Sequence, residues 1–94
     1  MNEHAHSSHS FFDCLKQAKE EFRLLTARHP ELAQLSAREL EVFDLLLSDN
    51  TLSQIAQELS ISYSSVHFHC KNIYRKLKLS SRRQLLISYK ELYD

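Results

Sequence analysis

Residues 62–79 read SYSSVHFHCKNIYRKLKL, an amphipathic pattern with the period of an α-helix. At about 100° per residue, the apolar side chains fall within one narrow arc. This stripe, which is expected to pack on a core, consists of Val66, Cys70, Ile73 and Leu77. The opposite arc carries Ser64, Phe68, Lys71 and Arg75, with His67 at its edge. The pattern therefore predicts a helix with one buried face and one outward face that carries cations and an unusual phenylalanine.

The charges of the chain are distributed unevenly, although its formal net charge is zero. The segment from Tyr63 to Lys90 contains no acidic residue and seven of the twelve Lys and Arg residues. The rest of the chain holds five cations and all twelve acids. A clustered basic segment of this kind predicts a polyanionic partner.

The length and composition indicate one small all-α domain. A chain of 94 residues buries only about 60% of the surface that it exposes when unfolded, which argues against a large enclosed active site. The absence of glycine, the single proline and the many Leu, Glu, Lys, Gln and Ser residues favour helices joined by short turns.

No targeting feature is expected from the sequence. No apolar run approaches the roughly 20 residues of a membrane span, and no export signal is visible at the N-terminus. The two cysteines, Cys14 and Cys70, are too few for a disulfide framework and are expected to be buried or idle thiols. We therefore expect a cytoplasmic protein without contact to a membrane.

The N-terminal third divides into two predicted parts. Residues 1–10 are polar, lack a hydrophobic period and are predicted to form a disordered tail. Residues 11–29 are predicted to form an amphipathic helix that Ser10 caps and that ends at His29-Pro30. Its seam lasts only two heptads and consists of Phe11, Leu15, Ala18, Phe22 and Leu25. Three roles stay open for it: covering the core of the domain, adding a dimer contact, or docking another protein.

Serine and threonine residues mark the helix starts in residues 35–94. Ser36 and Thr51 each open a capping box, with Glu39 and Gln54 three residues later. Ser62 is the predicted N-cap of the helix quoted above, which is expected to end at Leu79 and Ser80. The residues expected to be buried in the helix after Thr51 are Ile55, Ala56 and Leu59.

Two further turns complete this prediction. Asp49-Asn50 is the predicted turn after the first of these helices, since Asn and Asp best tolerate the left-handed conformation among residues other than glycine. Ser80 or Ser81 is expected to cap a fourth helix rich in Leu85, Leu86, Ile87, Tyr89 and Leu92. A short helix, a tight turn and a helix with a basic outer face follow helix-turn-helix order.

The segment from Leu35 to Tyr89 resembles the LuxR/GerE-type helix-turn-helix domain of bacterial transcription regulators. The resemblance rests on LSARELEVFDLLL, TLSQIAQELSIS and SSVHFHCKNIYRKLKLSSR, in which the family's residues recur at the family's spacings. Those residues are Arg38, Glu39, Glu41, Val42, Ile55, Ala56, Ile61, Ser62, Val66, His69, Lys76, Leu77, Ser81 and Arg82. The resemblance implies a four-helix DNA-binding domain, here spanning residues 35–94 and preceded by one extra helix.

The resemblance also implies site residues, and the helical period assigns the main ones to the outward face. The side chains implied to contact bases are His67, Phe68 and Lys71. Those implied to contact phosphates are Thr51, Ser53, Tyr63, Ser64, Ser65, Arg75 and Lys76. The last helix is the subunit contact in the family, so the residues expected at a dimer interface are Arg83, Ile87 and Lys90.

Several of these residues have competing interpretations. Phe68 lies about 200° from Val66 on the helix, so contact with a thymine methyl is favoured over core packing or an interface role. The family often has Lys or Arg where this chain has His67, and threonine where it has Ser65. Glu39 and Glu41 are expected to serve capping and an ion pair, with Arg82 as a candidate partner.

No enzymatic, metal or cofactor function is predicted. His4, His6 and His9 with Cys14 lack the spacing of a zinc site, and the serines and histidines lack a glycine-supported nucleophile turn. The expected function is a sequence-specific transcription regulator that binds double-stranded DNA as a homodimer on two half-sites. The alternative is a protein-interaction antagonist that sequesters a full-length regulator.

Overall fold

A computed structural model describes residue 20 and residues 23–93. The chain divides into two compact units, Met1–Pro30 and Glu31–Asp94. In the first unit, residues 23–28 are helical, and His29 donates its backbone N–H to the Leu25 carbonyl over 2.8 Å. The predicted end of this helix at His29-Pro30 is confirmed. The predicted tail and the seam residues Phe11, Leu15, Ala18 and Phe22 lie outside the described residues.

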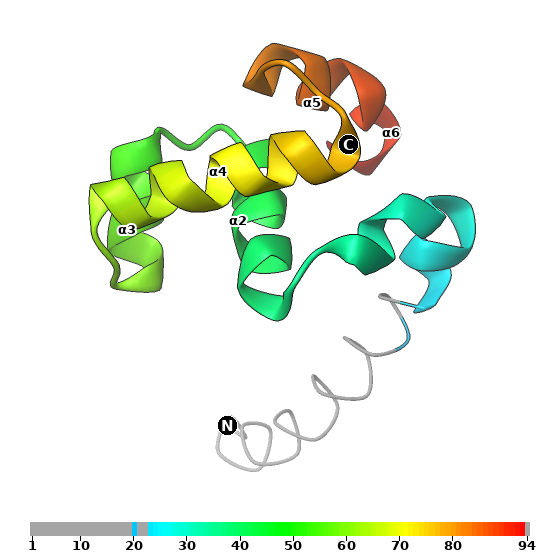
Figure 1. The fold of residues 1–94 in the computed structure, drawn as a ribbon, viewed down its shortest axis with the longest axis horizontal. Helices are drawn as coiled ribbons and strands as arrows, with labels where there is room; N and C mark the ends of the chain where they lie inside the picture. The colour runs from blue at the N-terminus through cyan, green and yellow to red at the C-terminus, as the bar shows by residue number, and fades with distance from the viewer. Residues whose placement is uncertain (1–19, 21–22, 94) are drawn as a thin grey trace, which may run out of the picture. The chain divides into compact units, whose positions relative to one another are not determined.

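The second unit consists of helices in the part of the chain that the structure describes, as the sequence predicted. Their bounds are η1 Pro30–Gln34, α2 Ala37–Leu47, α3 Leu52–Leu59, α4 Tyr63–Leu77, α5 Arg82–Ser88 and α6 Lys90–Tyr93. Helix α4 packs against both α2 and α3, and α5 packs against α2 (Figure 1). Within the described residues, no helix has the length and apolar character that a membrane crossing requires.

The core of this unit gathers one apolar stripe from each long helix. The predicted stripe of α4 is confirmed, since Val66 and Ile73 are fully buried and Cys70 and Leu77 are nearly so. The other side chains without exposed surface are Leu32, Val42, Leu46, Ile55 and Leu85. Burying one such side chain contributes about 1.5 to 3 kcal/mol, so these residues dominate the stability of the unit. Leu59, predicted to be buried, is only half-buried.

Reciprocal hydrogen bonds fix the starts of α2 and α3. Ser36 accepts from the Glu39 backbone N–H over 3.1 Å, and the Glu39 carboxylate accepts from the Ser36 N–H over 2.9 Å. Thr51 and Gln54 repeat the arrangement with distances of 3.1 and 2.8 Å. Both predicted capping boxes are confirmed, and each satisfies backbone donors that the first helical turn leaves unpaired.

The predicted turn after α2 is present, with turn residues at Ser48 and Asp49, but neither Asp49 nor Asn50 adopts the left-handed conformation. Among the described residues, positive φ angles occur at Ser60, with φ 55°, and at Lys78, with φ 58°. Asn50 instead donates its side-chain amide to the Leu45 carbonyl over 3.2 Å, which satisfies the end of α2 by a different route. A chain without glycine therefore uses a serine and a lysine for a conformation that costs about 1 to 2 kcal/mol per residue.

Helix α4 ends earlier than the sequence predicted. The Leu79 N–H bonds the Tyr74 carbonyl over 2.8 Å and the Lys78 N–H bonds the Arg75 carbonyl over 3.3 Å. This pair of bonds is a Schellman motif, which closes a helix at a left-handed residue. The last helical residue is thus Leu77, and the predicted end at Leu79 and Ser80 is two residues too late.

The predicted fourth helix is interrupted at Tyr89, which separates α5 from α6. Tyr89 is nearly buried, its ring lies edge-on to Phe43 with centroids 5.2 Å apart, and its hydroxyl donates to Glu31 over 2.6 Å. The backbone of Tyr89 is not helical, with φ −118° and ψ 31°, at the position where its side chain enters the core. Of the two predicted caps, Ser81 accepts from the Gln84 N–H, while Ser80 bonds the Gln84 side chain.

Candidate nucleic-acid interface

The N-terminus of α4 carries a cluster of hydroxyl groups. Ser62 accepts from the Ser65 N–H over 3.1 Å and donates its hydroxyl to the Ser65 oxygen over 2.9 Å. The Ser64 oxygen lies 3.3 Å from that of Ser62. The first backbone N–H groups of a helix and nearby hydroxyls suit an anion such as a phosphate. The predicted phosphate contacts Ser64 and Tyr63 are exposed there, whereas Ser65 is half-buried.

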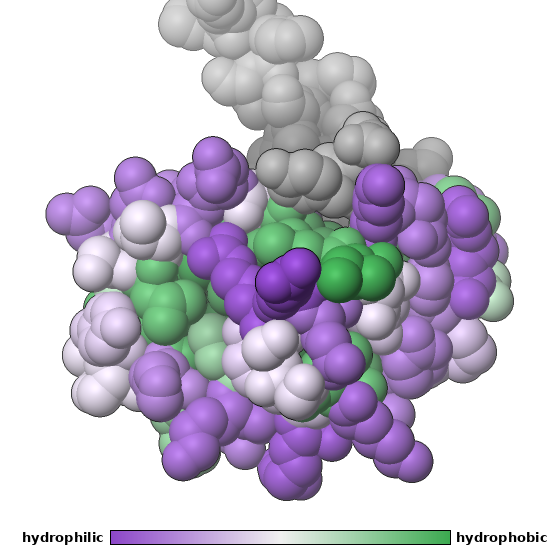
Figure 2. All heavy atoms as spheres, turned by 90° about the horizontal axis from the view of Figure 1, so that it is seen from above, coloured by the Kyte–Doolittle hydropathy of each residue, from purple (hydrophilic) through white to green (hydrophobic). Residues whose placement is uncertain are grey.

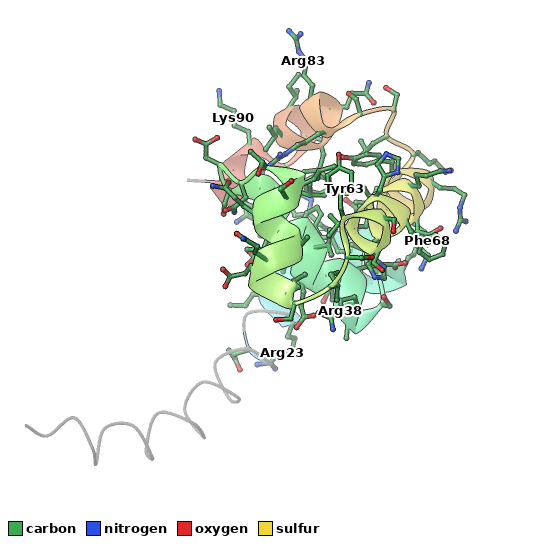
Figure 3. All side chains as sticks on the ribbon, turned by 90° about the vertical axis from the view of Figure 1, so that its left-hand side faces the viewer. Arg23, Arg38, Tyr63, Phe68, Arg83 and Lys90 are labelled. Carbon is green, nitrogen blue, oxygen red and sulfur yellow. The ribbon has the colours of Figure 1, made fainter. Side chains whose placement is uncertain are left out.

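The outward face of α4, defined as Ser64, His67, Phe68, Lys71 and Arg75, is exposed at every position. Phe68 exposes 61% of its surface, and it lies on the outer side of α4 (Figure 3). The sequence-predicted base contacts therefore share one exposed face, in the segment that contains no acidic residue. His69 is half-buried at the margin of that face.

Two ring contacts order the aromatic side chains around this face. The rings of Tyr63 and His67 stack with centroids 6.5 Å apart and an interplanar angle of 23°. Phe68 meets the half-buried His69 edge-on, with centroids 5.9 Å apart. Such contacts restrict side-chain rotation, so each exposed ring has a neighbour that limits its orientation.

The predicted phosphate contacts outside α4 are exposed at the start of α3. Thr51 caps that helix with its oxygen, and Ser53 lies in its first turn. A capping hydroxyl accepts one hydrogen bond and retains its proton for an external acceptor. Both residues are therefore available to a ligand that lies along α3.

Lys76 differs from its neighbours, because its ammonium already has a partner inside the domain. Its Nζ lies 2.7 Å from the Oε1 of Glu39, whose side chain is 7% exposed, while that of Lys76 is 28% exposed. Burial raises the pKa of Glu39, but hydrogen bonds with Lys76 and Ser36 outweigh it and leave the pKa below its ordinary value. A phosphate contact by Lys76 stays a prediction, and its observed role is to join α4 to α2.

Glu39 and Glu41 form ion pairs as expected, but Arg82, the candidate partner, takes part in neither of them. Arg82 donates to the Leu46 carbonyl over 3.0 and 3.2 Å and to the Ser48 carbonyl over 2.9 Å. It therefore binds the carbonyl end of α2, where a cation also interacts favourably with the helix dipole. Glu41 instead pairs with Arg38 over 3.1 Å on the surface of α2. Arg38 and Glu41 are three residues apart on one helix, a spacing from which the sequence could have indicated their pairing. The partners of Arg82 depend on how the helices pack and have no such local signal.

Burial shifts the pKa values of one thiol and two tyrosine hydroxyls in this unit. Burial raises the pKa of the Cys70 thiol, as expected for an idle cysteine, and it raises the pKa of Tyr74 to about 12. Burial and the hydrogen bond to Glu31 raise the pKa of Tyr89 as well. Across residues 20 and 23–93, no three His, Cys, Asp or Glu side chains are grouped to hold a metal ion. His4, His6, His9 and Cys14 lie outside the described residues.

The residues predicted for a dimer interface lie on the exposed side of α5 and α6. Ile87 exposes 66% of its surface, and Arg83 and Lys90 project away from the domain (Figure 3). The surface in Figure 2 is mostly hydrophilic, with apolar side chains between the polar ones. Within the described part of the second unit, the large hydrophobic residues that remain exposed are Tyr63, Phe68 and Ile87.

Comparisons with known proteins find a family match within the second unit. The family described as GerE, bacterial regulatory proteins of the luxR family, matches residues 33–89. Spore germination protein GerE of Bacillus subtilis is 43% identical over 53 residues, which cover 56% of this chain and 72% of GerE. The HTH-type transcriptional regulator MalT of Vibrio campbellii is 33% identical over 66 residues, or 67% of this chain and 7% of MalT. The probable transcriptional regulatory protein SgaR of Hyphomicrobium methylovorum is 43% identical over 54 residues, or 57% and 26% of the two chains.

The family match covers most of the second unit, including the elements that present the outward face of α4. The chain spans only a small part of the longer regulators, and no solved structure gives a significant match. The family consists of DNA-binding transcription regulators rather than enzymes. With its family match over more than half of the chain and its helix-turn-helix in α3 and α4, the chain belongs to the luxR family of bacterial regulatory proteins.

Proposed function

We propose that this protein is a sequence-specific transcription regulator that binds double-stranded DNA as a homodimer, one subunit on each of two half-sites. The observation that carries the proposal is the outward face of α4, where exposed cations flank an exposed phenylalanine. A second helix of a helix-turn-helix that presents such a face fits the major groove. As a bacterial DNA-binding regulator, the protein would work in the cytoplasm.

The outward face divides into contacts that read bases and contacts that position the helix. We assign base contacts to His67, Phe68 and Lys71, whose side chains project from the middle of α4. Phosphate contacts at the start of α3 and along α4 are assigned to Thr51, Ser53, Tyr63, Ser64, Ser65 and Arg75. Arg75 donates to Asn72 over 3.1 Å, and its other N–H groups suit a phosphate. Lys76 adds positive potential nearby, although its ammonium pairs with Glu39.

Dimerisation is proposed through α5 because Ile87 is an apolar residue that its own domain does not cover. In a two-fold interface the same patch occurs on both subunits, so Ile87 would meet its counterpart near the axis. Arg83 and Lys90 flank it and would lie toward the solvated rim, where like charges are screened. An exposed isoleucine by itself is common, so the proposal requires a direct test.

The test is selection of binding sites from random duplexes, followed by sedimentation of wild type and Ile87→Asp. We expect the wild type to enrich a two-part sequence and to sediment as a dimer. Ile87→Asp brings two carboxylates together at the axis, so it should sediment as a folded monomer and lose tight operator binding. The matched controls are Ile87→Leu, which keeps the apolar contact, and Ser88→Asp, which adds the same charge to an adjacent position.

Each part of the proposal has an outcome that overturns it. If Ile87→Asp remains dimeric with full affinity, the proposed α5 interface is incorrect. If no sequence is enriched at all, the protein does not read DNA, and an antagonist that sequesters a full-length regulator becomes the better account. Circular dichroism of every variant separates loss of binding from loss of folding.

A further inference from the structure

Phe68 is the one side chain of the outward face of α4 that can neither donate nor accept a hydrogen bond. It is 61% exposed between cations and hydroxyls, on the side of α4 remote from the core stripe. The ring centroids of Phe68 and His69 lie 5.9 Å apart, and this contact restricts the orientation of the Phe68 ring without covering it. An exposed apolar ring gains free energy when another apolar group removes it from water. Phe68 is therefore suited to meet an apolar feature of a ligand.

The major groove offers few apolar features. The edges of guanine, adenine and cytosine present hydrogen-bond donors and acceptors there, whereas thymine also presents a C5 methyl group. A phenylalanine that enters the groove gains little binding free energy from polar base edges, and it leaves their donors and acceptors without hydrogen-bond partners. Among the four ordinary base pairs, the thymine methyl is the matching contact.

We infer that Phe68 recognises the C5 methyl group of a pyrimidine, so the protein accepts 5-methylcytosine as well as thymine at one position of each half-site. The inference rests on the proposed groove binding by α4. Thymine and 5-methylcytosine differ in the polar group at C4, an acceptor in thymine and a donor in cytosine. Because Phe68 interacts with neither, it distinguishes methylated from unmethylated bases and not thymine from methylated cytosine.

The neighbouring cations do not remove this ambiguity. Lys71 lies three residues after Phe68, about 60° around α4, and its ammonium only donates hydrogen bonds. It would therefore contact an acceptor on an adjacent base pair, such as guanine. Arg75 lies two turns from Phe68 along the helix, within reach of the backbone. The predicted consequence is a regulator whose affinity for its site responds to cytosine methylation.

The test measures affinities for the selected operator with single-base replacements. Replacing each thymine in turn by uracil removes one methyl group and leaves all hydrogen-bonding groups in place. We expect one position per half-site at which affinity falls about fourfold, the factor expected from burying one methyl-sized group. At that position, 5-methylcytosine paired with guanine should bind about fourfold more tightly than cytosine paired with guanine.

Variants of the protein show whether Phe68 causes the effect. Phe68→Ala should bind DNA with and without the methyl group equally, while Phe68→Leu, which remains apolar, should retain part of the preference. Lys71→Ala should keep the methyl effect and lose discrimination at another base pair. Because Phe68 and Lys71 are both exposed, all three variants should fold, which circular dichroism checks.

The outcomes separate this inference from the proposed function. Salt-sensitive, sequence-specific binding without any effect of uracil or 5-methylcytosine overturns methyl recognition and leaves DNA binding intact. A methyl preference that Phe68→Ala retains in full assigns it to another residue and also overturns the inference. Absence of specific binding to any duplex overturns the inference and the proposed function together.

Discussion

The two faces of α4 belong to one helix but obey different constraints. The inner face holds Val66, Cys70, Ile73 and Leu77 in the core, where an apolar contact in the same chain accounts for each side chain. The outward face presents its five side chains to solvent, where no contact in the core requires them: Ser64, His67, Phe68, Lys71 and Arg75. The inner face therefore determines whether α4 is held in place, whereas the outward face determines what it can bind.

The largest effect should come from Ile73→Ala on the inner face. Ile73 is fully buried, so removing its side-chain methyl and methylene groups leaves a cavity and costs about 2 to 5 kcal/mol of unfolding free energy. Phe68→Ala is the matched variant on the outer face and should change stability by no more than about 0.5 kcal/mol. Urea denaturation measures both. Equal destabilisation by the two variants would contradict the division of the helix into a packing face and a binding face.

Lys76 and Arg75 are adjacent cations of α4, but Lys76 pairs with Glu39 inside the domain whereas Arg75 is exposed. Lys76→Gln should destabilise the domain by about 2 to 3 kcal/mol at neutral pH, since it leaves the nearly buried Glu39 carboxylate without its cation. Arg75→Gln, its matched control, lies on the exposed face and should have little effect on stability. Urea titrations at several pH values measure the difference.

The pH dependence of the Lys76→Gln effect follows from Glu39. The pKa of Glu39 in the folded protein lies below its ordinary value of 4.5, so the unfolded chain binds more protons near that pH. The contribution of the ion pair is therefore present above about pH 4.5 and is lost as the pH falls through the lower folded pKa. The difference between wild type and Lys76→Gln should shrink in acid. A difference that is independent of pH would show that the charge of Glu39 plays no part.

Lys71 should affect discrimination rather than stability. Lys71→Ala removes a donor assigned to a base edge and should reduce discrimination at one base pair by about 1 to 3 kcal/mol. Arg75→Ala, by contrast, should weaken binding to all sequences about equally. Competition binding with singly substituted operators gives both profiles. Identical profiles for wild type and Lys71→Ala would remove Lys71 from the set of base contacts.

The smallest effect should come from His67, which stands where the family often has Lys or Arg. His67→Lys adds a fixed cation to the outward face of α4, so it should raise the affinity for DNA at pH 7 by a few-fold at most. Fluorescence anisotropy at constant ionic strength measures the change. If the affinity stays the same, His67 does not face the DNA.

Local patterns predicted most of α2, α3 and α4 because helix geometry relates residues three and four positions apart. The stripe of α4, the caps at Ser36, Thr51 and Ser62 and the exposure of Phe68 all follow from that geometry. The candidate site is predictable for the same reason, since its main residues lie on one helix face. Their contacts with DNA stay predictions.

Contacts between distant residues were not predictable in the same way. Lys76 and Glu39 are 37 residues apart, and Tyr89 and Glu31 are 58 apart, so their pairing depends on how the helices pack. The same holds for Arg82, which was assigned to a glutamate but binds the carbonyl end of α2. The left-handed residues Ser60 and Lys78 were missed because neither type favours that conformation. At each of these residues a pair of backbone hydrogen bonds closes the preceding helix and offsets the local preference.

The dependence of DNA affinity on salt tests most directly whether the outer face of α4 binds DNA. For wild type, the logarithm of the association constant should fall steeply with the logarithm of salt concentration, by about 0.9 per phosphate neutralised. Arg75→Ala removes one assigned phosphate contact from each of the two subunits, so the slope should be shallower by about 1.8 while the sequence preference stays the same. A nearly flat dependence for wild type, or an unchanged slope for Arg75→Ala, would contradict this account of α4.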